Sequence, residues 1–165
     1  MGEATLSTER LKLVPAMRDE VLAGIEALTP AHRAEVSPEW LARARAASMV
    51  DPWLFGFSAT ARDTGAVVGA CGFKGPPDAE GVVEITYGVD PAHQKRGYAT
   101  EAAQALIAFA FGSGLVRVVR AHTRPGNVAS ERVLAKCGFE RIGLVIDPED
   151  GEVLRWERMN VTQIA

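Results

Sequence analysis

One continuous stretch most constrains the fold, because it joins a strand pattern to a helix pattern through a basic glycine turn. Apolar residues dominate 82–89 and recur at helical spacing over 99–110. The turn between them contains Lys95, Arg96 and Gly97. The first turn of a helix has amide groups without intrahelical partners and carries the positive end of the helix dipole, so such a junction binds anions. We therefore expect a pyrophosphate site in this turn.

The turn matches neither of two well-known phosphate loops, because the chain contains no G-x-x-x-x-G-K-[ST] and no G-x-G-x-x-G string. The pattern Gln94-x-x-Gly97-x-Ala99 after a strand instead resembles the acetyl-CoA pyrophosphate loop of the GNAT N-acetyltransferases. Further strings resemble the branch of that superfamily named for acetylating ribosomal-protein N-termini: Thr-Glu-Arg-Leu at 8–11, Tyr-Ala-Thr-Glu-Ala at 98–102, Asn-Val-Ala-Ser at 127–130 and Lys-Cys-Gly-Phe at 136–139.

Apolar periodicity and turn residues predict the element order β-α-α-β-β-β-α-β-α-β-β over one domain, residues 1–165. Two helices follow the first strand, and a hairpin is expected over 53–73. The resemblance implies an α/β (α+β) fold with a mixed, mostly antiparallel sheet of six to seven strands and about four flanking helices. It also implies that the two central strands, at 82–89 and 115–123, splay apart.

Charge and composition exclude several other classes of protein. The net charge is −3 and the pI is about 5.7, with basic residues spread along the chain, so we expect no direct nucleic-acid partner. No apolar run is long enough to cross a membrane, and the N-terminus has neither a secretory nor a myristoylation pattern, so the cytoplasm is the expected location. Two isolated cysteines and three scattered histidines predict no metal site.

If the resemblance holds, the cosubstrate is acetyl-CoA. The residues expected to bind its pyrophosphate are Gln94, Lys95, Arg96, Gly97, Tyr98, Ala99 and Thr100. Asn127 is expected to hold the pantetheine amides, in addition to or instead of capping a helix. A bulged strand near Gly88 and Val89 is expected to present a backbone N–H group to the oxyanion.

Acetyl transfer to an amine requires the amine to be neutral. A lysine side chain with a pKa of about 10.4 is neutral in roughly one part in 2,500 at pH 7, which costs about 4.6 kcal/mol. An α-amine with a pKa of about 7.7 costs only about 1 kcal/mol. A protein N-terminus therefore needs a weaker base, and the resemblance to the ribosomal-protein branch makes it the favoured acceptor. The alternatives are a small-molecule amine, such as an aminoglycoside, a polyamine or an amino-acid-like metabolite, or a non-catalytic acyl-CoA sensor.

Two residues are candidates for the general base. Glu84 lies in an apolar strand, where loss of solvation would make its carboxylate more basic. It could instead face solvent or pair with an arginine. His122 is the rival, because it lies five residues before Asn127, where some relatives carry a basic glutamate, and because histidine titrates near neutral pH. The alternative is a histidine with no catalytic role.

The proton donor for the leaving thiolate is harder to assign. Many members of the superfamily carry a tyrosine on the last helix, but Leu134 stands at the corresponding place and no tyrosine occurs in 127–139. Ser130 or a water is the expected acid, unless none is needed, since a thiol with a pKa of about 8.5 leaves readily. Cys137 is expected to pack as a small apolar residue.

Two further features leave alternatives open. Trp40 and Trp53 either line the acceptor side of the cleft or pack in the core. The apolar stretch 153–159 could support a homodimer, as relatives often pair.

Overall fold

The computed structural model describes residues 5–161. The N-terminal targeting patterns considered above fall largely on residues 1–4, which lie outside this range. The elements, in chain order, are β1 (Leu6–Ser7), β2 (Leu11–Pro15), α1 (Arg18–Glu26), α2 (Pro30–Ala34), α3 (Pro38–Ala46), β3 (Phe57–Ala61), β4 (Val67–Phe73), β5 (Val82–Val89), a 3₁₀ turn (Pro91–His93), α4 (Tyr98–Gly112), β6 (Val118–Thr123), α5 (Val128–Lys136), β7 (Glu140–Asp147) and β8 (Gly151–Met159).

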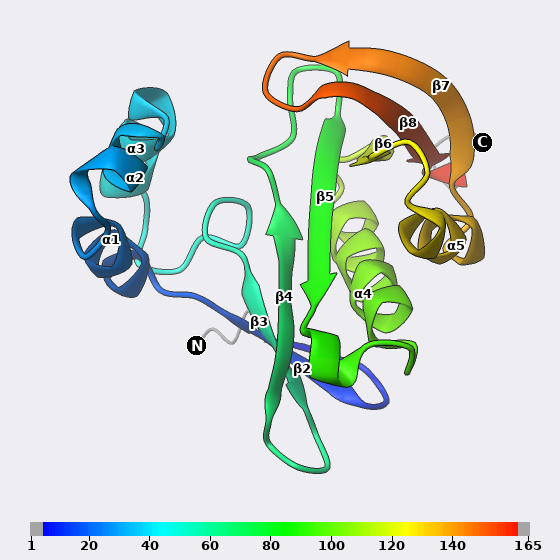
Figure 1. Ribbon diagram of the computed structural model, residues 1–165, viewed down its shortest axis with the longest axis horizontal. Coiled ribbons are helices and arrows are strands. Elements are labelled where there is room, and N and C mark those ends of the chain that lie inside the picture. Colours follow the sequence, from blue (N-terminus) through cyan, green and yellow to red (C-terminus); the bar gives the residue numbers. More distant parts are fainter. Residues whose placement is uncertain (1–4, 162–165) are drawn as a thin grey trace.

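The strands form one open sheet in the order β1-β2-β3-β4-β5-β6-β8-β7 (Figure 1). Every neighbouring pair is antiparallel except β5 and β6, which are parallel. The expected mixed, mostly antiparallel α/β fold is therefore confirmed. The described chain has one strand more than the expected maximum, because Leu6 and Ser7 pair with Leu13 and Lys12 of β2.

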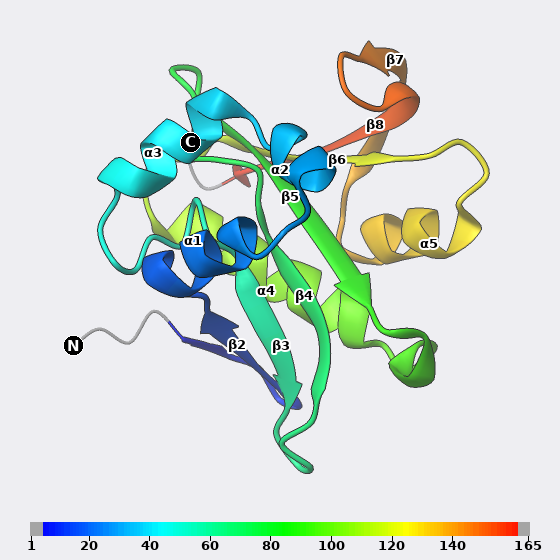
Figure 2. The ribbon, with the colours of Figure 1, turned by 60° about the vertical axis from the view of Figure 1, so that its left-hand side comes forward.

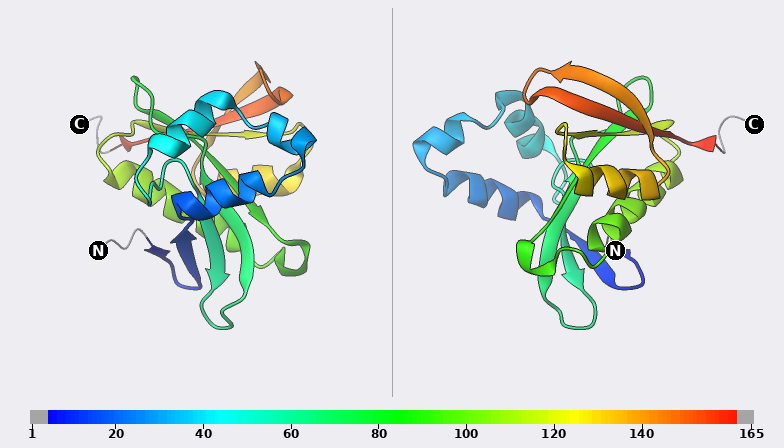
Figure 3. Two further views of the ribbon diagram at one scale, coloured as in Figure 1. Left: turned by 90° about the vertical axis from the view of Figure 1, so that its left-hand side faces the viewer. Right: turned by 45° about the vertical axis from the view of Figure 1, so that its right-hand side comes forward.

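The helices cover the sheet from both sides. Helices α1 to α3 lie on one side and α4 and α5 on the other (Figures 2 and 3). The helical spacing of Ala103, Leu106 and Ala110 gives α4 an apolar face whose three side chains are fully buried. This face packs in one core cluster with Val83 and Ile85 of β5. The packing fixes the start of α4 relative to the end of β5.

The two central strands diverge, as expected. Parallel pairing of β5 with β6 covers only Val82↔Val118, Val83↔Val119 and Glu84↔Arg120. The expected bulge at Gly88 is wrong, because β5 keeps one register with β4 from Ile85 to Val89. The gap opens instead because each strand continues along its antiparallel neighbour, β5 with β4 and β6 with β8.

Two local expectations differ from the structure. Two helices are expected after the first strand, but three lie between β2 and β3, because the Thr29 hydroxyl accepts a hydrogen bond from the His32 amide and starts α2. The segment before β3, expected to be strand from Trp53, forms turns, because the Asp51 carboxylate accepts from the Trp53 amide and the Asp51 carbonyl from the next two amides. Among residues 5–161, no helix is both long and apolar enough to cross a membrane.

Candidate active site

The turn before α4 has the geometry of an anion site. Gly97 is the N-cap residue and has a φ of 84°, and no side chain caps the helix. The amide groups of the first turn, those of Tyr98, Ala99 and Thr100, are therefore available to a ligand. Lys95 also has a positive φ, of 65°. Backbone in which residues of positive and negative φ alternate directs successive N–H groups to one side, where they can bind phosphate oxygens.

Gln94 holds this turn to the end of β5. Its side-chain amide donates to the Val89 carbonyl at 2.9 Å. Gln94 thus supports the loop, and its amide nitrogen is used within the protein. Its expected contact with a pyrophosphate stays a prediction.

A second anchor holds the start of α4 to the β1–β2 turn. The Glu101 carboxylate accepts from the Thr8 hydroxyl at 2.5 Å, the Arg10 amide at 2.7 Å and Arg10 Nε at 2.8 Å. Burial raises the pKa of Glu101, but these hydrogen bonds and the charge of Arg10 outweigh it and leave the pKa below its usual value. The Thr-Glu-Arg-Leu and Tyr-Ala-Thr-Glu-Ala strings therefore contact each other and position the phosphate turn.

A cavity of about 340 Å³ occupies the gap between β5 and β6. Side chains alternate along β5, so Glu84 and Tyr87 lie on opposite faces of the sheet. The cavity is lined by both, with His122 and Lys74 near Glu84, and with Ser130 near Tyr87. The splay therefore joins the α1–α3 face of the sheet to the α4–α5 face.

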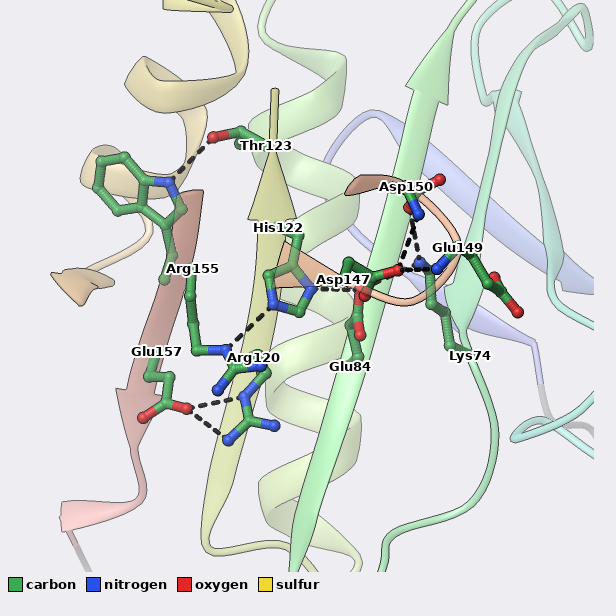
Figure 4. A network of polar contacts seen from close by, with 11 residues as sticks. Lys74, Glu84, Arg120, His122, Thr123, Asp147, Glu149, Asp150, Arg155 and Glu157 are labelled. Atoms are coloured by element: carbon green, nitrogen blue, oxygen red, sulfur yellow. Dashed lines mark hydrogen bonds and ion pairs between the residues drawn. The ribbon is translucent and has the colours of Figure 1, made fainter. Parts of the chain in front are cut away.

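Glu84 and His122, considered above as rival bases, contact each other. His122 Nδ1 lies 2.9 Å from Glu84 Oε2, and Arg155 Nε donates to His122 Nε2 at 3.1 Å (Figure 4). A guanidinium has no acceptor, so Nε2 is unprotonated and Nδ1 carries the proton that Glu84 accepts. His122 is neutral in this arrangement, its side chain is only 7% exposed, and neither ring nitrogen is available to a substrate. The structure favours Glu84 over His122 as the base.

Lys74 completes this cluster. Its Nζ lies 3.2 Å from the same Glu84 Oε2 and 3.7 Å from Asp150 Oδ2, in the turn between β7 and β8. Glu84 Oε1 has no partner within the described part of the chain. This oxygen remains available to accept a proton.

On the opposite face, Tyr87 reaches helix α5. Its hydroxyl lies 3.0 Å from Ser130 Oγ and 3.4 Å from the Ser130 carbonyl oxygen. Burial raises the pKa of Tyr87, partly offset by the hydrogen bond with Ser130, and nearby Cys137 raises it further. The phenol is therefore protonated at neutral pH. A tyrosine hydroxyl from β5 thus contacts the helix that has no tyrosine in 127–139, and sequence reasoning missed this contact.

Asn127 caps α5, because its Oδ1 accepts from the Ser130 amide at 3.2 Å. Its side-chain NH₂ group is not needed for the cap. The capping role is therefore established, and the amide can still donate to a ligand in the cavity that it lines.

The structure distinguishes between Gly88 and Val89. The bonds from Lys74 N to Glu84 O and from Asp90 N to Val68 O mark hydrogen-bonded pairs of the β4–β5 ladder. Pairs alternate along an antiparallel ladder, so the Gly88 N–H faces β4 and the Val89 N–H faces the gap. Val89 is the better candidate for an oxyanion donor.

A second, larger cavity of about 640 Å³ lies on the Glu84 face of the sheet and shares Thr86 and Tyr87 with the first. Leu54, Phe55 and Gly56 line one side of it, and Gly56 lies close to Gly72, since a Cβ on Gly72 would lie 2.8 Å from the Gly56 Cα. Phe55 lines this cavity, whereas neither Trp40 nor Trp53 does.

The two tryptophans pack against other aromatic rings. Trp53 packs at a tilt of 55° against both Phe73 and Phe109, at centroid distances of 4.7 and 5.1 Å, and Trp40 lies edge-on to Phe55 at 6.5 Å. Their packing role, rather than the substrate-wall role, fits the structure. Cys137 also packs in the core, where burial raises the pKa of its thiol to about 11 and makes it a poor nucleophile.

Comparison with known proteins supports the resemblance to the GNAT N-acetyltransferases over most of the chain. The family model of the acetyltransferase (GNAT) domain matches residues 10–140. An uncharacterized N-acetyltransferase, YjdG of Bacillus subtilis, is 31% identical over 106 residues, which is 64% of this chain and 58% of that protein. The chain thus aligns with less than two thirds of the length of this relative.

Two solved structures share the fold at low sequence identity. A putative ribosomal-protein-serine acetyltransferase from Vibrio cholerae has a TM-score of 0.69 and 21% identity, over 96% of this chain and 98% of that one. Mycobacterium smegmatis RimJ, in complex with CoA-disulfide, has a TM-score of 0.68 and 20% identity, over 96% of this chain and 88% of that one. With the match over residues 10–140, these findings show that the chain belongs to the GNAT acetyltransferase family.

Proposed function

We propose that this protein transfers the acetyl group of acetyl-CoA to a primary amine by direct nucleophilic attack, and that a protein N-terminal α-amine is the favoured acceptor. One observation carries the proposal. The cavity in the β5–β6 gap has the Glu84 carboxylate on one side and the Tyr87–Ser130 hydroxyl pair on the other. A carboxylate that can act as the base and a hydroxyl pair that can act as the acid thus lie on opposite sides of one cavity.

The cosubstrate approaches from the α4–α5 side. The Tyr98, Ala99 and Thr100 amides bind the pyrophosphate, with Lys95 and Arg96 supplying positive charge. The side-chain NH₂ of Asn127 donates to the pantetheine arm. The Val89 N–H then donates to the acetyl carbonyl oxygen and stabilises the negative charge that develops there.

The reaction proceeds by attack of the neutral amine on the thioester carbonyl. Glu84 Oε1 takes one proton from the ammonium form of the acceptor, which makes the amine neutral. The C–N bond forms, and the tetrahedral intermediate collapses with cleavage of the C–S bond. The second proton that the nitrogen loses replaces the one that the hydroxyl pair gives to the CoA thiolate, and Glu84 releases its proton to solvent. His122 holds Glu84 in place through Nδ1 and does not itself accept a proton.

Charge around the site bears on the acceptor class. The charged residues that line the smaller cavity balance one another: Lys74, Arg124, Glu84 and Asp150. Asp90 is the one charged residue that lines the larger cavity in the part of the chain described. Together the two cavities have a surplus of only one carboxylate, too few to bind a polycation, which disfavours aminoglycosides and polyamines. An acceptor with one reactive ammonium, such as a peptide N-terminus, fits better.

The thermal unfolding midpoint, measured with millimolar acetyl-CoA, free CoA or ATP, tests the cosubstrate. We expect a rise of several degrees with both CoA species and none with ATP, because a ligand at about 100 times its Kd adds roughly 2.7 kcal/mol. Acetylation of Ala- and Ser-initiated peptides is then compared with that of spermidine and kanamycin. No shift with CoA species overturns the proposal, and a shift without acetylation of any amine indicates a sensor module.

Tyr87→Phe tests the hydroxyl pair. The variant keeps the ring but loses the hydroxyl, so we expect kcat to fall roughly 10- to 100-fold. This loss is at or below the low end of the range for general acids, because a thiolate leaves readily without one. KM for acetyl-CoA should change little. Ser130→Ala should cause a similar loss, and the double variant little more, since the two groups act as one unit. An additive double variant, or full activity of Tyr87→Phe, contradicts the assignment.

A homodimer and a cytoplasmic location stay predictions. β8 lies between β6 and β7, and it buries Val153, Leu154 and Trp156 within the chain. The stretch 153–159 therefore offers no free strand edge to a second copy.

A further inference from the structure

Lys74 neutralises the carboxylate that an acceptor ammonium needs. Its Nζ lies 3.2 Å from Glu84 Oε2 and it lines the same cavity. Glu84 is the carboxylate expected to receive the amine in the proposed reaction. An incoming ammonium group and Lys74 therefore compete for one negative charge.

Of the two groups that hold Glu84 Oε2, only Lys74 can move away at small cost. His122 is 7% exposed and is fixed from behind by Arg155, whereas the Lys74 side chain is 40% exposed. Lysine carries its charge on a flexible four-carbon stem. Asp150 lies only 3.7 Å from Nζ in the β7–β8 turn, so it offers the displaced ammonium a second ion pair (Figure 4).

We propose that Lys74 is an internal counter-ion, which pairs with Glu84 in the empty site and shifts to Asp150 when the ammonium group of the acceptor arrives. The site then selects acceptors that arrive charged, because a neutral group cannot replace the ion pair. This inference rests on the proposed function in one respect, the role of Glu84 as the carboxylate that meets the amine.

The same contacts explain why Lys74 is not itself the acceptor. Burial lowers the pKa of Lys74, but the charges of Glu84 and Asp150 and the hydrogen bond to Glu84 outweigh it and leave the pKa above the usual value. A lysine held in the protonated state is a poor nucleophile, whereas an α-amine deprotonates near neutral pH.

NMR of the protein labelled at lysine Cε tests the displacement without any turnover. The chain has four lysines, Lys12, Lys74, Lys95 and Lys136. Titration with Ala-Gly-Gly amide should shift the Lys74 signal saturably and leave that of Lys12 unchanged. The N-acetylated form of the same peptide, which has no ammonium group, should cause no shift. A Lys74 signal that stays fixed, or that moves equally with both peptides, overturns the proposal.

Steady-state kinetics with the same peptide provide an independent measurement. We expect Lys74→Met to lower KM for the peptide by about two- to fivefold, the range for a partly exposed ion pair, with KM for acetyl-CoA unchanged. Lys74→Arg, which keeps the charge, should stay close to wild type. Asp150→Asn should raise KM for the peptide, since the displaced lysine loses its second partner.

Lys12→Met controls for loss of a lysine elsewhere, because Lys12 is an exposed residue of β2. An unchanged or higher KM for the peptide in Lys74→Met contradicts displacement. Failure of the proposed function looks different, since the wild type would then acetylate no amine while the NMR titration still reports on Lys74.

Discussion

We expect Gly97→Glu to lose acetyl-CoA binding about a thousandfold while the protein stays folded. Two unit charges 4 Å apart repel by about 4 kcal/mol at an effective dielectric constant of 20, and the new carboxylate would face the pyrophosphate at the start of α4. The fold has room for the side chain, because the nearest atom to an added Cβ is Arg10 Nη2 at 3.0 Å, the end of a flexible side chain. Isothermal calorimetry and the CoA-induced thermal shift measure the loss.

Two controls separate charge from strain. Gly97 has a φ of 84°, which costs any L-residue about 1–2 kcal/mol. Gly97→Gln carries the same strain without the charge and should retain more affinity than Gly97→Glu. Gly114→Glu adds the same residue at a φ of 78° beyond the other end of α4, where an added Cβ meets open space. It should bind acetyl-CoA like wild type, and unaltered affinity of Gly97→Glu removes the phosphate site from this turn.

For Glu84→Gln we expect kcat to fall about 10²- to 10⁴-fold, the range for loss of a general base. Glutamine keeps the shape of the side chain and can still accept the hydrogen bond from His122 Nδ1. It cannot take a proton from the amine. The CoA-induced thermal shift should be unchanged, so the loss of rate is separate from cofactor binding. The pH–rate profile should lose the limb that reports the base.

Glu157→Gln is the matched control. Glu157 is also a carboxylate with a cationic partner, Arg120, at 2.7 Å, and it lies on the same face of the sheet, in register with Arg120 next to Glu84. It does not line the cavity. We expect its kcat to stay close to that of wild type. Equal losses in the two variants would mean that Glu84 acts through structure or general electrostatics and not as the base.

Local sequence patterns were sufficient to predict the turn before α4 and most elements. Gly97 at the start of a helix, the cap of α5 by Asn127 and the strand ending near Val89 each depend on residues within a few positions of one another. The splay could also be expected, but only through the family resemblance. The bulge expected together with the splay was wrong, because β5 keeps one register with β4. This register depends on the pairing with β4 and not on the sequence of β5 alone.

The contacts within the site could not be read from the sequence. Glu84 and His122 were considered as rivals, yet the parallel register that places Glu84 beside Arg120 brings them within 2.9 Å of each other, although 38 positions separate them. The tautomer of His122 depends on Arg155, from a third strand. The contact of the Tyr87 hydroxyl with Ser130 was not predicted, since nothing in the sequence around Tyr87 indicates it.

The three residue pairs that join β5 to β6 divide the sheet into two sections, β1 to β5 and β6 to β8. Apart from the two pairs that join the short edge strand β1 to β2, this is the shortest ladder of the sheet. Bending at this ladder stretches few hydrogen bonds, so the junction is the natural hinge between the two sections. A ligand that enters the gap touches both sections and restrains their relative rotation. The β5–β6 ladder and a ligand bound in the gap would then both hold the two sections at one angle. The geometry of the site would therefore depend on whether the gap is occupied.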